Sequence, residues 1–300
     1  MSNDTPTDKE DGVTRYVYVN GAYRRYDEAQ IHAEDRGFQF ADAVYEVCEI
    51  HDHAIVDEDR HLARLERSLG ELGIAMPMRQ KAFQAVLQET VRRNRVANGI
   101  VYLQVSRGAG PRNFYFDGVE TPPTVVCLAR SQSRRGMEAG AAKGIAVKSM
   151  PDMRWGRCDI KTVMLLPASL AKESARAEGA QEAWFLDAEG NVREGGSSNA
   201  WIITPDDKLV TPPATNAILR GITRTTLIDL LEREGLTLEE RPFTIEEAQN
   251  AREAFITSAS NLVMPVVSVD GRPIGNGHPG SLTERLRAAF HEVAQKRQLA

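Results

Sequence analysis

The sequence predicts an α+β protein built from two halves of similar size. Short alternating segments are joined by turn residues, which is typical of hairpins and antiparallel strands. Amphipathic helical segments lie between them, without the strict strand–helix alternation of a doubly wound parallel sheet. We therefore do not expect a nicotinamide-binding fold, which is built on such a doubly wound sheet.

The composition is that of an ordinary globular protein. The 300 residues are 42% hydrophobic and 26% charged, which is enough chain for two cores. The net charge of −5 gives no basic surface for nucleic acid, and no apolar run approaches the ~20 residues of a membrane span. Residues 1–12 are polar and acidic, so we expect a disordered tail and no signal peptide. The three cysteines lack metal spacing, which predicts reduced thiols in a cytoplasmic protein.

Residues 13–130 are expected to form a small N-terminal α+β domain. Asn20-Gly21 separates two alternating segments and predicts a tight hairpin. Leucines spaced 3, 4 and 3 apart predict a helix at 61–73. Arg64 lies beside the buried stripe, where the alternative to a ligand-binding role is an ordinary side chain that turns outward. The other elements expected here are strands at 41–47, 99–107 and 124–129, a short strand after 51–53, and a helix at 79–94.

Residues 131–142 are polar and contain glycine, which predicts a linker before a larger domain at 143–300. In that domain a helix is expected to begin at Lys161 and to reach Glu178. Ser281 with Glu284 is expected to cap a C-terminal amphipathic helix. The other elements expected here are a capped short helix at 244–247, a helix from 219–223 to 234, a hairpin at 183–193, and strands at 144–149, 200–204, 254–257 and 264–269.

Lys161 is a candidate amine nucleophile. It follows Arg154 and Arg157, and both desolvation and nearby positive charge favour the free amine that attacks a carbonyl. The alternative is a surface lysine before a helix. The two arginines could contact substrate carboxylates or bias the site electrostatically, and the sequence leaves both alternatives open. Glu194 follows a predicted strand and precedes a glycine pair, which places a carboxylate on a sharp turn.

A phosphate site is expected at Gly221-Ile222-Thr223. A helix beginning there offers free backbone N–H groups, a hydroxyl and the positive end of the helix dipole. Arg64 could add a charge-assisted contact to the same anion. Together with Lys161 and Glu194, these residues describe a site for pyridoxal 5′-phosphate. That cofactor needs a Schiff-base lysine, an acidic partner for its pyridine nitrogen and a phosphate cup.

Six motifs in this order also resemble the fold-type-IV pyridoxal-phosphate enzymes, which include D-amino-acid and branched-chain aminotransferases and aminodeoxychorismate lyase. The closest resemblance is to the D-amino-acid aminotransferases, and it covers nearly the whole chain. It implies a two-domain α+β fold and a homodimer. The motifs are EDRGFQFADAVYEV (34–47), HLARL (61–65), RCDIKT (157–162), EGGSSN (194–199), LRGITR (219–224) and FITSAS (255–260).

The resemblance implies a role for each matching residue. Lys161 forms the Schiff base and carries a proton between the substrate Cα and the cofactor. Glu194 pairs with the pyridine nitrogen, Leu219 packs on the ring, and Tyr45 projects into the substrate pocket. The implied cofactor-binding residues are Arg64, Lys161, Glu194, Ser198, Asn199, Leu219, Ile222, Thr223, Ser258 and Ala259. The implied substrate-binding residues are Tyr45, Arg112 and Phe114, with Arg112 in a carboxylate-binding loop that can reach across a dimer interface.

Two departures from the family pattern bear on the substrate carboxylate and on the cofactor phosphate. Phe114 stands where these enzymes commonly have the histidine of Arg-x-His, so a donor beside Arg112 is lost. Ala259 stands where a phosphate-binding threonine is usual, which removes a hydroxyl but leaves the backbone N–H.

The sequence therefore predicts a transaminase that moves an amino group from a D-amino acid to a 2-oxo acid by a ping-pong route. A branched-chain or (R)-amine transaminase and a lyase of the same fold are alternatives, as is a binding protein that has lost catalysis. Residues 102–105 lack the usual branched-chain Tyr-x-Arg-Pro, which argues against that enzyme. We expect no nucleic-acid or membrane partner. We expect no metal site, because the six histidines show no ligand pattern. We expect packing roles for Trp155 and Trp201 and a structural thiol at Cys158.

Overall fold

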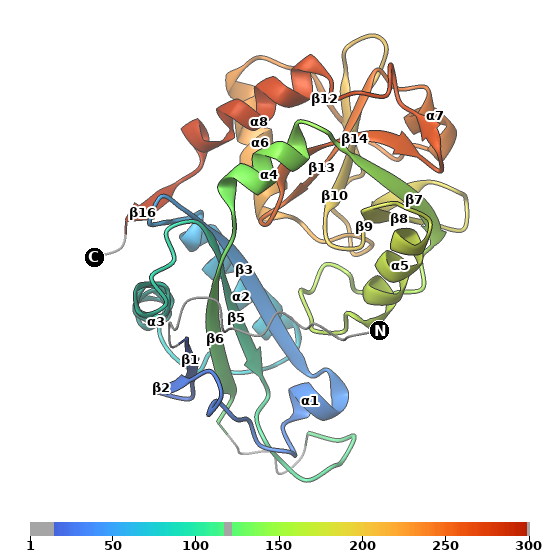
Figure 1. Cartoon of the computed structure of the whole chain (residues 1–300). Coiled ribbons are helices and arrows are strands. Elements are labelled where there is room, and N and C mark those ends of the chain that lie inside the picture. The colour runs from blue at the N-terminus through green and yellow to red at the C-terminus, as the bar shows by residue number, and fades with distance from the viewer. Residues whose placement is uncertain (1–14, 117–121, 299–300) are drawn as a thin grey trace, which may run out of the picture.

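The computed structural model describes residues 15–116 and 122–298, and the predicted tail at 1–12 lies outside them. Two β-sheets form its framework (Figure 1). The strands of the first sheet are β1 (Tyr16–Val19), β2 (Ala22–Arg25), β3 (Ala43–His51), β4 (Ala54–Val56), β5 (Gly99–Ser106), β6 (Thr124–Ser131) and β16 (Lys296–Gln298). Their order across the sheet is β16-β4-β3-β5-β6-β1-β2.

The second sheet is larger and mixes parallel with antiparallel pairs. Its strands are β7 (Ile145–Pro151), β8 (Glu182–Leu186), β9 (Val192–Gly195), β10 (Asn199–Ile203), β11 (Leu209–Thr211), β12 (Leu238–Glu240), β13 (Glu253–Ser258), β14 (Leu262–Val269) and β15 (Arg272–Pro273). Their order is β12-β11-β10-β13-β14-β7-β8-β9, with β15 paired to β14. The predicted α+β class is confirmed.

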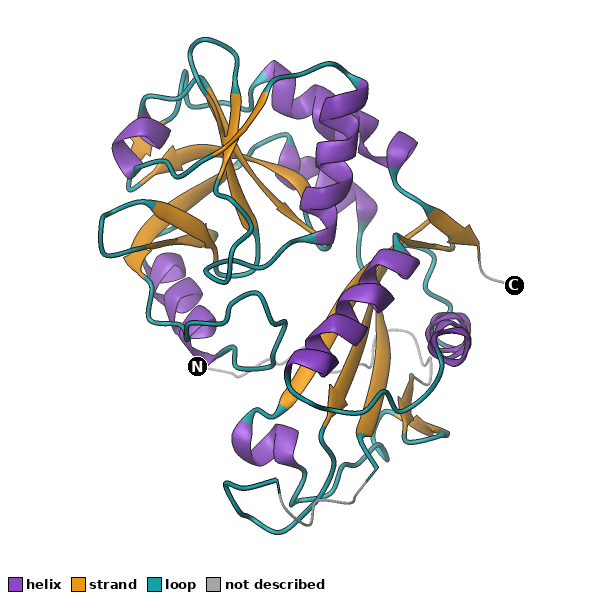
Figure 2. Ribbon diagram, turned by 180° about the vertical axis from the view of Figure 1, so that it is seen from behind, coloured by secondary structure: helices purple, strands orange, loops and turns teal. Residues whose placement is uncertain are grey.

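Two helices, α2 (Glu58–Glu71) and α3 (Gln80–Arg93), cover the first sheet. Figure 2 shows α2 lying along the strands of this sheet. The predicted leucine stripe is confirmed, since Leu62, Leu65 and Leu69 are buried in the core beneath α2. The predicted hairpin is also confirmed, because β1 pairs with β2 across Asn20 and Gly21. Both turn residues have positive φ, as a type I′ turn requires.

Helices α6 (Ile222–Arg233) and α8 (Ser281–Val293) share a core with one face of the second sheet. Another core contains Trp184 and Phe243, and α5 (Leu166–Ala177) packs against β7 and β8. The remaining helices are α1 (Arg36–Phe40), α4 (Arg134–Ala141) and α7 (Ile245–Gln249). The predicted cap of α7 is confirmed, because Thr244 accepts a hydrogen bond from the Glu247 N–H. Within residues 15–116 and 122–298, no helix is both long and apolar enough to cross a membrane.

Two segments near the expected domain boundaries join the halves. Residues 134–141 of the expected linker form helix α4 rather than an irregular connection. Strand β16, near the end of the chain, returns to the first sheet and pairs with β4, with Lys296 opposite Val56. A division into two domains stays a proposal, in which residues 296–298 belong with the first sheet.

The helix expected to begin at Lys161 begins five residues later, so that prediction was wrong. α5 starts at Leu166 with a proline in its first turn, where the missing N–H costs nothing. Residues 161–163 instead run beside β3: the Tyr45 N–H donates to the Lys161 carbonyl (3.0 Å), and the Val163 N–H donates to that of Ala43 (3.1 Å). Tertiary pairing thus overrides the local helical pattern.

The predicted cap of α8 was also wrong. Gly280 is the N-cap residue and has no side chain to offer. The buried Glu253 of β13 accepts hydrogen bonds from the N–H groups of Leu282 (3.2 Å) and Thr283 (2.8 Å). A carboxylate at the positive end of the helix dipole satisfies the same donors that a cap would.

Candidate active site

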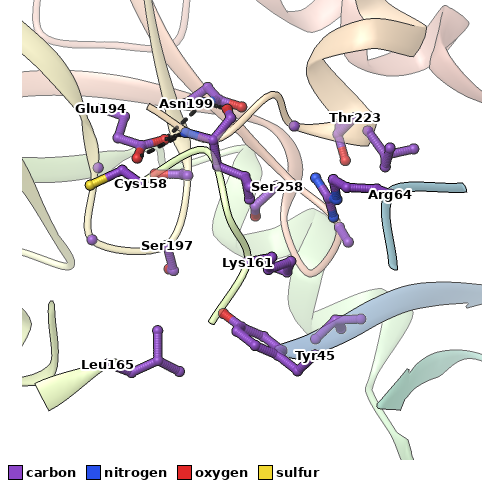
Figure 3. Close-up of a pocket in the computed structure, with 18 of the residues that line it drawn as sticks. Tyr45, Arg64, Cys158, Lys161, Leu165, Glu194, Ser197, Asn199, Thr223 and Ser258 are labelled. Atoms are coloured by element: carbon purple, nitrogen blue, oxygen red, sulfur yellow. Dashed lines mark hydrogen bonds between the residues drawn. The ribbon is translucent and has the colours of Figure 1, made fainter. Parts of the chain in front are cut away.

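A cavity of about 210 Å³ lies between the two sheets. Its walls come from β3, α2, the segment around Lys161, the β9–β10 turn, the start of α6 and the end of β13 (Figure 3). Every predicted cofactor-binding residue lines it, and so does Tyr45. These side chains come from positions 45 to 259, so the fold brings together motifs far apart in the sequence.

Lys161 projects into the middle of this cavity. The pairing of its segment with β3 holds its backbone, and its Nζ lies 4.2 Å from the centroid of the Tyr45 ring. Among residues 15–116 and 122–298, its amine has no hydrogen-bond or ion-pair partner. A lysine amine that is aimed into a cavity and is not bonded to a carboxylate is available to bond a carbonyl carbon.

Arg64 lines the cavity and points inward, so the alternative of an outward-turned surface arginine is excluded. Its Nε and Nη2 donate to the two oxygens of Glu46, at 2.8 and 2.7 Å, and the side chain is only 9% exposed. Its Nη1 donates to the Arg220 carbonyl (2.9 Å), which ties α2 to the loop before α6. The guanidinium therefore lies beside the helix start that was expected to bind a phosphate.

Glu46 is a site residue that the sequence reasoning missed. It is buried, and it contacts His61 Nδ1 (2.7 Å) as well as Arg64. Burial would raise the pKa of Glu46, but the Arg64 charge and the hydrogen bonds from Arg64 and His61 outweigh it and lower the pKa to about 2. The available signal was a charged residue on the face of β3 that also carries Val44 and Cys48, since that face must be buried against α2.

Glu194 occupies the other end of the cavity and is also buried. It accepts hydrogen bonds from Arg154 Nη1 (2.6 Å), Asn199 Nδ2 (3.0 Å) and the Leu219 N–H (3.2 Å to each oxygen). Burial raises its pKa to about 7, although Arg154 and the Leu219 N–H act in the opposite direction. A cationic ring nitrogen beside this carboxylate would favour the ionised form.

The structure separates the two arginines that precede Lys161. Arg154 binds Asp152 through Nε and Nη2 as well as Glu194 through Nη1, so it biases the site electrostatically. Arg157 lies outside the cavity lining and pairs with Asp159 and Glu71.

The start of α6 forms the wall of the cavity where a phosphate was expected to bind. Its N-cap residue, Gly221, makes no side-chain cap, so the first N–H groups of the helix lack that partner, and Ile222 and Thr223 line the cavity. A Cβ at Gly221 would lie 2.1 Å from Asn199 Oδ1, so only glycine allows this approach. Ser258 and Ala259 line the same cavity. Backbone donors, a helix dipole and a nearby guanidinium fit a phosphate.

The buried carboxylate of Glu182 supports the glycine turn between β9 and β10. Ser198 Oγ donates to Glu182 (2.9 Å), and Lys172 Nζ contacts both Glu182 (3.3 Å) and Ser197 Oγ (2.9 Å). The hydroxyl of Ser198 is thus engaged away from the cavity centre. Lys172 and Glu182 were not identified from the sequence, because neither lies within one of the six motifs.

The expected packing residues differ in their surroundings. Trp201 is buried and stacks on Phe255, whereas Trp155 lines the cavity. Cys158 also lines it, but burial raises the pKa of its thiol to about 11, so the unreactive protonated form dominates.

Arg112 and Phe114 do not join the cavity of their own chain. Both are exposed on the loop after β5, where Phe114 packs edge-on against Phe40 and the Arg112 guanidinium lies 5.3 Å from the Phe40 ring. Arg36 Nη1 holds this loop through the Asn113 carbonyl (2.6 Å).

The arrangement defines a class of enzyme: a free lysine amine, a buried carboxylate and a phosphate wall around one cavity suit a pyridoxal-phosphate enzyme. The model of the family "Amino-transferase class IV" matches residues 43–269. The chain belongs to this aminotransferase family. The predicted family, aminotransferase activity and pyridoxal phosphate cofactor are thereby confirmed.

Known proteins of two kinds are similar to the chain. D-alanine aminotransferase of Bacillus licheniformis is 38% identical over 91% of this chain and 95% of its own length. That of Staphylococcus haemolyticus is 35% identical over 94% and 98%. Among solved structures, the branched-chain amino acid aminotransferase of T.th., solved with pyridoxamine 5′-phosphate, has a TM-score of 0.84 at 25% identity, over 93% of each chain. The Escherichia coli branched-chain enzyme, at 23% identity and a TM-score of 0.85 over 93% of this chain and 94% of its own, shows the fold alone.

Proposed function

We propose that the protein moves the amino group of a D-amino acid to a 2-oxo acid by a ping-pong mechanism. The observation that carries the proposal is the meeting of Lys161, Glu194 and Arg64 around one cavity. The preference for D-amino acids rests on relatives described as D-alanine aminotransferases, which match along almost their full length.

Pyridoxal phosphate, when bound, supplies an electrophilic carbon and a ring that accepts electrons. Lys161 Nζ, which projects into the cavity, would supply the amine for that carbon and would carry a proton to and from the substrate Cα. Glu194 would hold a proton at the ring nitrogen, steadied by Asn199 and the Leu219 N–H. Arg64 and the start of α6 would bind the phosphate, and Tyr45 would border the substrate beside Lys161.

We further propose a homodimer in which the loop after β5 reaches the cavity of the second copy. Arg112 could then bind the substrate carboxylate, although it lies outside its own cavity. Phe38, Phe114 and Tyr115 are each more than 70% exposed around this loop, and large clustered apolar side chains are typical of protein interfaces. Sedimentation velocity should give a dimer. Arg112→Ala should raise the KM for D-alanine; a monomeric, fully active enzyme would remove this part of the proposal.

Absorbance tests the chemistry directly. The cofactor-loaded protein should be yellow, D-alanine should bleach its visible band, and a 2-oxo acid should restore it. Lys161→Ala should bind the cofactor without this band and lose activity by about 10³-fold or more. The matched control is Lys143→Ala, which removes an exposed lysine and should change neither. A persistent band in Lys161→Ala would move the nucleophile to another residue.

The amino donor separates the alternatives. Bleaching by L-leucine but not by D-alanine would favour a branched-chain transaminase, and bleaching by an (R)-amine alone would favour an amine transaminase. Turnover that needs no 2-oxo acid acceptor would favour the lyase. We also propose a cytoplasmic location, since Cys48, Cys127 and Cys158 are free and buried.

A further inference from the structure

A second cavity, of about 360 Å³, lies apart from the first and shares no lining residue with it. The end of β3 forms one wall, and helices α4 and α8 form others. Figure 1 shows α4 and α8 in the upper half of the molecule, above the end of β3. No residue of the proposed transaminase chemistry lies here, so the cavity needs an explanation of its own.

Three potential metal ligands meet in its wall. Glu49 and His51 come from β3 and His291 comes from α8, and their ligand atoms all lie within 4.8 Å of one another. His291 Nε2 is 3.0 Å from both oxygens of Glu49, and His51 Nδ1 is 3.6 Å from Oε1. The two imidazole rings stack, with centroids 3.8 Å apart and an angle of 27° between their planes. One nitrogen of each ring lies near Oε1 of Glu49, and a rotation of the rings would let both lone pairs point at one ion.

The second nitrogen of His51 has the partner that a metal ligand needs. Its Nε2 is 3.4 Å from Asp52 Oδ2. A carboxylate beside the distal nitrogen of a coordinating imidazole fixes the tautomer, so that the other nitrogen presents its lone pair to the metal. Glu49 and His51 are themselves buried, which holds their side chains in place.

The charge around the cavity also favours a cation. Its lining contains the carboxylates of Glu49, Glu138 and Glu284 against the guanidinium groups of Arg134 and Arg287. Arg287 is neutralised by Glu138, which its Nε and Nη2 contact at 3.1 and 3.0 Å. Arg134 is paired with Asp52 at 3.1 Å. Neither guanidinium is therefore left as an unpaired charge opposing a metal ion.

We propose that Glu49, His51 and His291 bind a divalent transition-metal ion of the zinc class. Two imidazoles and one carboxylate suit Zn²⁺, which takes a water molecule or a further group as its fourth ligand. The adjoining cavity leaves room for that ligand. The ion would join the first sheet to α8 and stabilise the junction of the two halves without entering the transaminase site.

The test uses cofactor-loaded protein without an affinity tag, first dialysed against a chelator. Calorimetric titration with Zn²⁺ should show one ion bound per chain and should raise the melting temperature. Mg²⁺, which prefers oxygen ligands, should do neither. Co²⁺ should bind with visible bands and without thiolate charge-transfer absorption, since the ligands contain no sulfur.

Variants identify the ligands. His291→Ala and His51→Ala should each weaken Zn²⁺ binding by at least about tenfold. The matched control is His278→Ala, which removes a histidine outside the cluster from the same half and should bind Zn²⁺ like the parent. Glu49→Gln keeps the shape of the side chain and one acceptor oxygen, and it should weaken Zn²⁺ binding as the histidine variants do. It therefore tests the site even if a histidine variant folds poorly.

Loss of binding in the ligand variants alone supports the site. No binding of Zn²⁺ to the parent protein would mean that the three residues form only a hydrogen-bonded junction, and the proposal would fail. Equal weak binding by the parent and all variants would likewise overturn it, since that result indicates adventitious surface binding. None of these outcomes depends on transaminase activity.

Discussion

Two buried carboxylates each contact an arginine of the cofactor cavity, yet their pKa values shift in opposite directions. The pKa of Glu46 is lowered to about 2, whereas the pKa of Glu194 is raised to about 7. Burial raises both values, so the difference comes from the donors that face each group.

The donors differ because Arg64 binds one carboxylate, whereas Arg154 is shared between two. Arg64 gives Glu46 two hydrogen bonds, its remaining contact is a backbone carbonyl, and His61 adds a third. Arg154 gives Glu194 one hydrogen bond, because two of its nitrogens bind Asp152. Glu46 is therefore fully neutralised by the protein, while Glu194 shares its arginine with another carboxylate.

The difference indicates that the Glu194 end of the cavity, unlike the Glu46 end, needs a further positive charge to balance its carboxylate. Glu46 and Arg64 neutralise each other, and we propose that Glu46 positions the Arg64 guanidinium for a phosphate. Glu194 can still be stabilised by another cation, which suits the protonated nitrogen of the pyridine ring. The two carboxylates should therefore respond differently to the same substitution.

The largest effect is expected for Glu194→Gln. A neutral amide cannot hold a proton on the ring nitrogen, so the rate of D-alanine conversion should fall by about 10³-fold while the cofactor stays bound. Single-turnover absorbance measures the rate. Glu189→Gln, on the exposed β8–β9 turn, is the control and should be fully active. A change of less than about tenfold would contradict the assigned role of Glu194.

A loss of stability is expected for Glu46→Gln. The buried Arg64 would lose its counter-charge, which costs about 3 kcal/mol in the free energy of unfolding. Cofactor affinity should fall as Arg64 shifts. Glu71→Gln is the control, since the Glu71–Arg157 pair is more than one-third exposed and should contribute less than about 1 kcal/mol. Urea unfolding measures the stability of both variants. Equal losses of stability would show that the buried Glu46–Arg64 pair contributes no more than a surface pair.

The smallest effect, counted per pH unit, is a pH dependence in the cofactor-free protein. Because folding raises the pKa of Glu194 from 4.5 to about 7, the folded state binds the extra proton between these values. Its stability relative to Glu194→Gln should therefore fall as the pH rises through this range, by up to about 1.4 kcal/mol per pH unit.

The contribution of Glu46 to stability should change with pH in the opposite direction. Because folding lowers its pKa from 4.5 to about 2, its contribution is complete above pH 4.5 and is lost as the pH falls toward 2. Its stability relative to Glu46→Gln should therefore be flat from about pH 5 to about pH 7. Urea unfolding across these pH values checks both slopes, and parallel curves for the two pairs would show that the carboxylates do not differ.

The sequence by itself determined the elements whose signal is local. Leucine spacing defined α2, Asn20-Gly21 defined the first hairpin, and the pattern at 244–247 defined the cap of α7, because periodicity and turn geometry depend only on near neighbours. Its motifs also named Lys161 and Glu194, which line the cavity as expected.

Only the tertiary structure decided the partners of these residues. The start of α5, the cap that Glu253 gives α8, the inward turn of Arg64 and the meeting of Glu49 with His291 each depend on segments far apart in the chain. The same holds for the two carboxylates. Glu46 and Glu194 are the same residue type in the sequence, and their opposite pKa shifts follow from how folding distributes Arg64, His61, Arg154 and Asp152 around them. Burial and charge pairing are properties of a three-dimensional neighbourhood, so no local pattern encodes them.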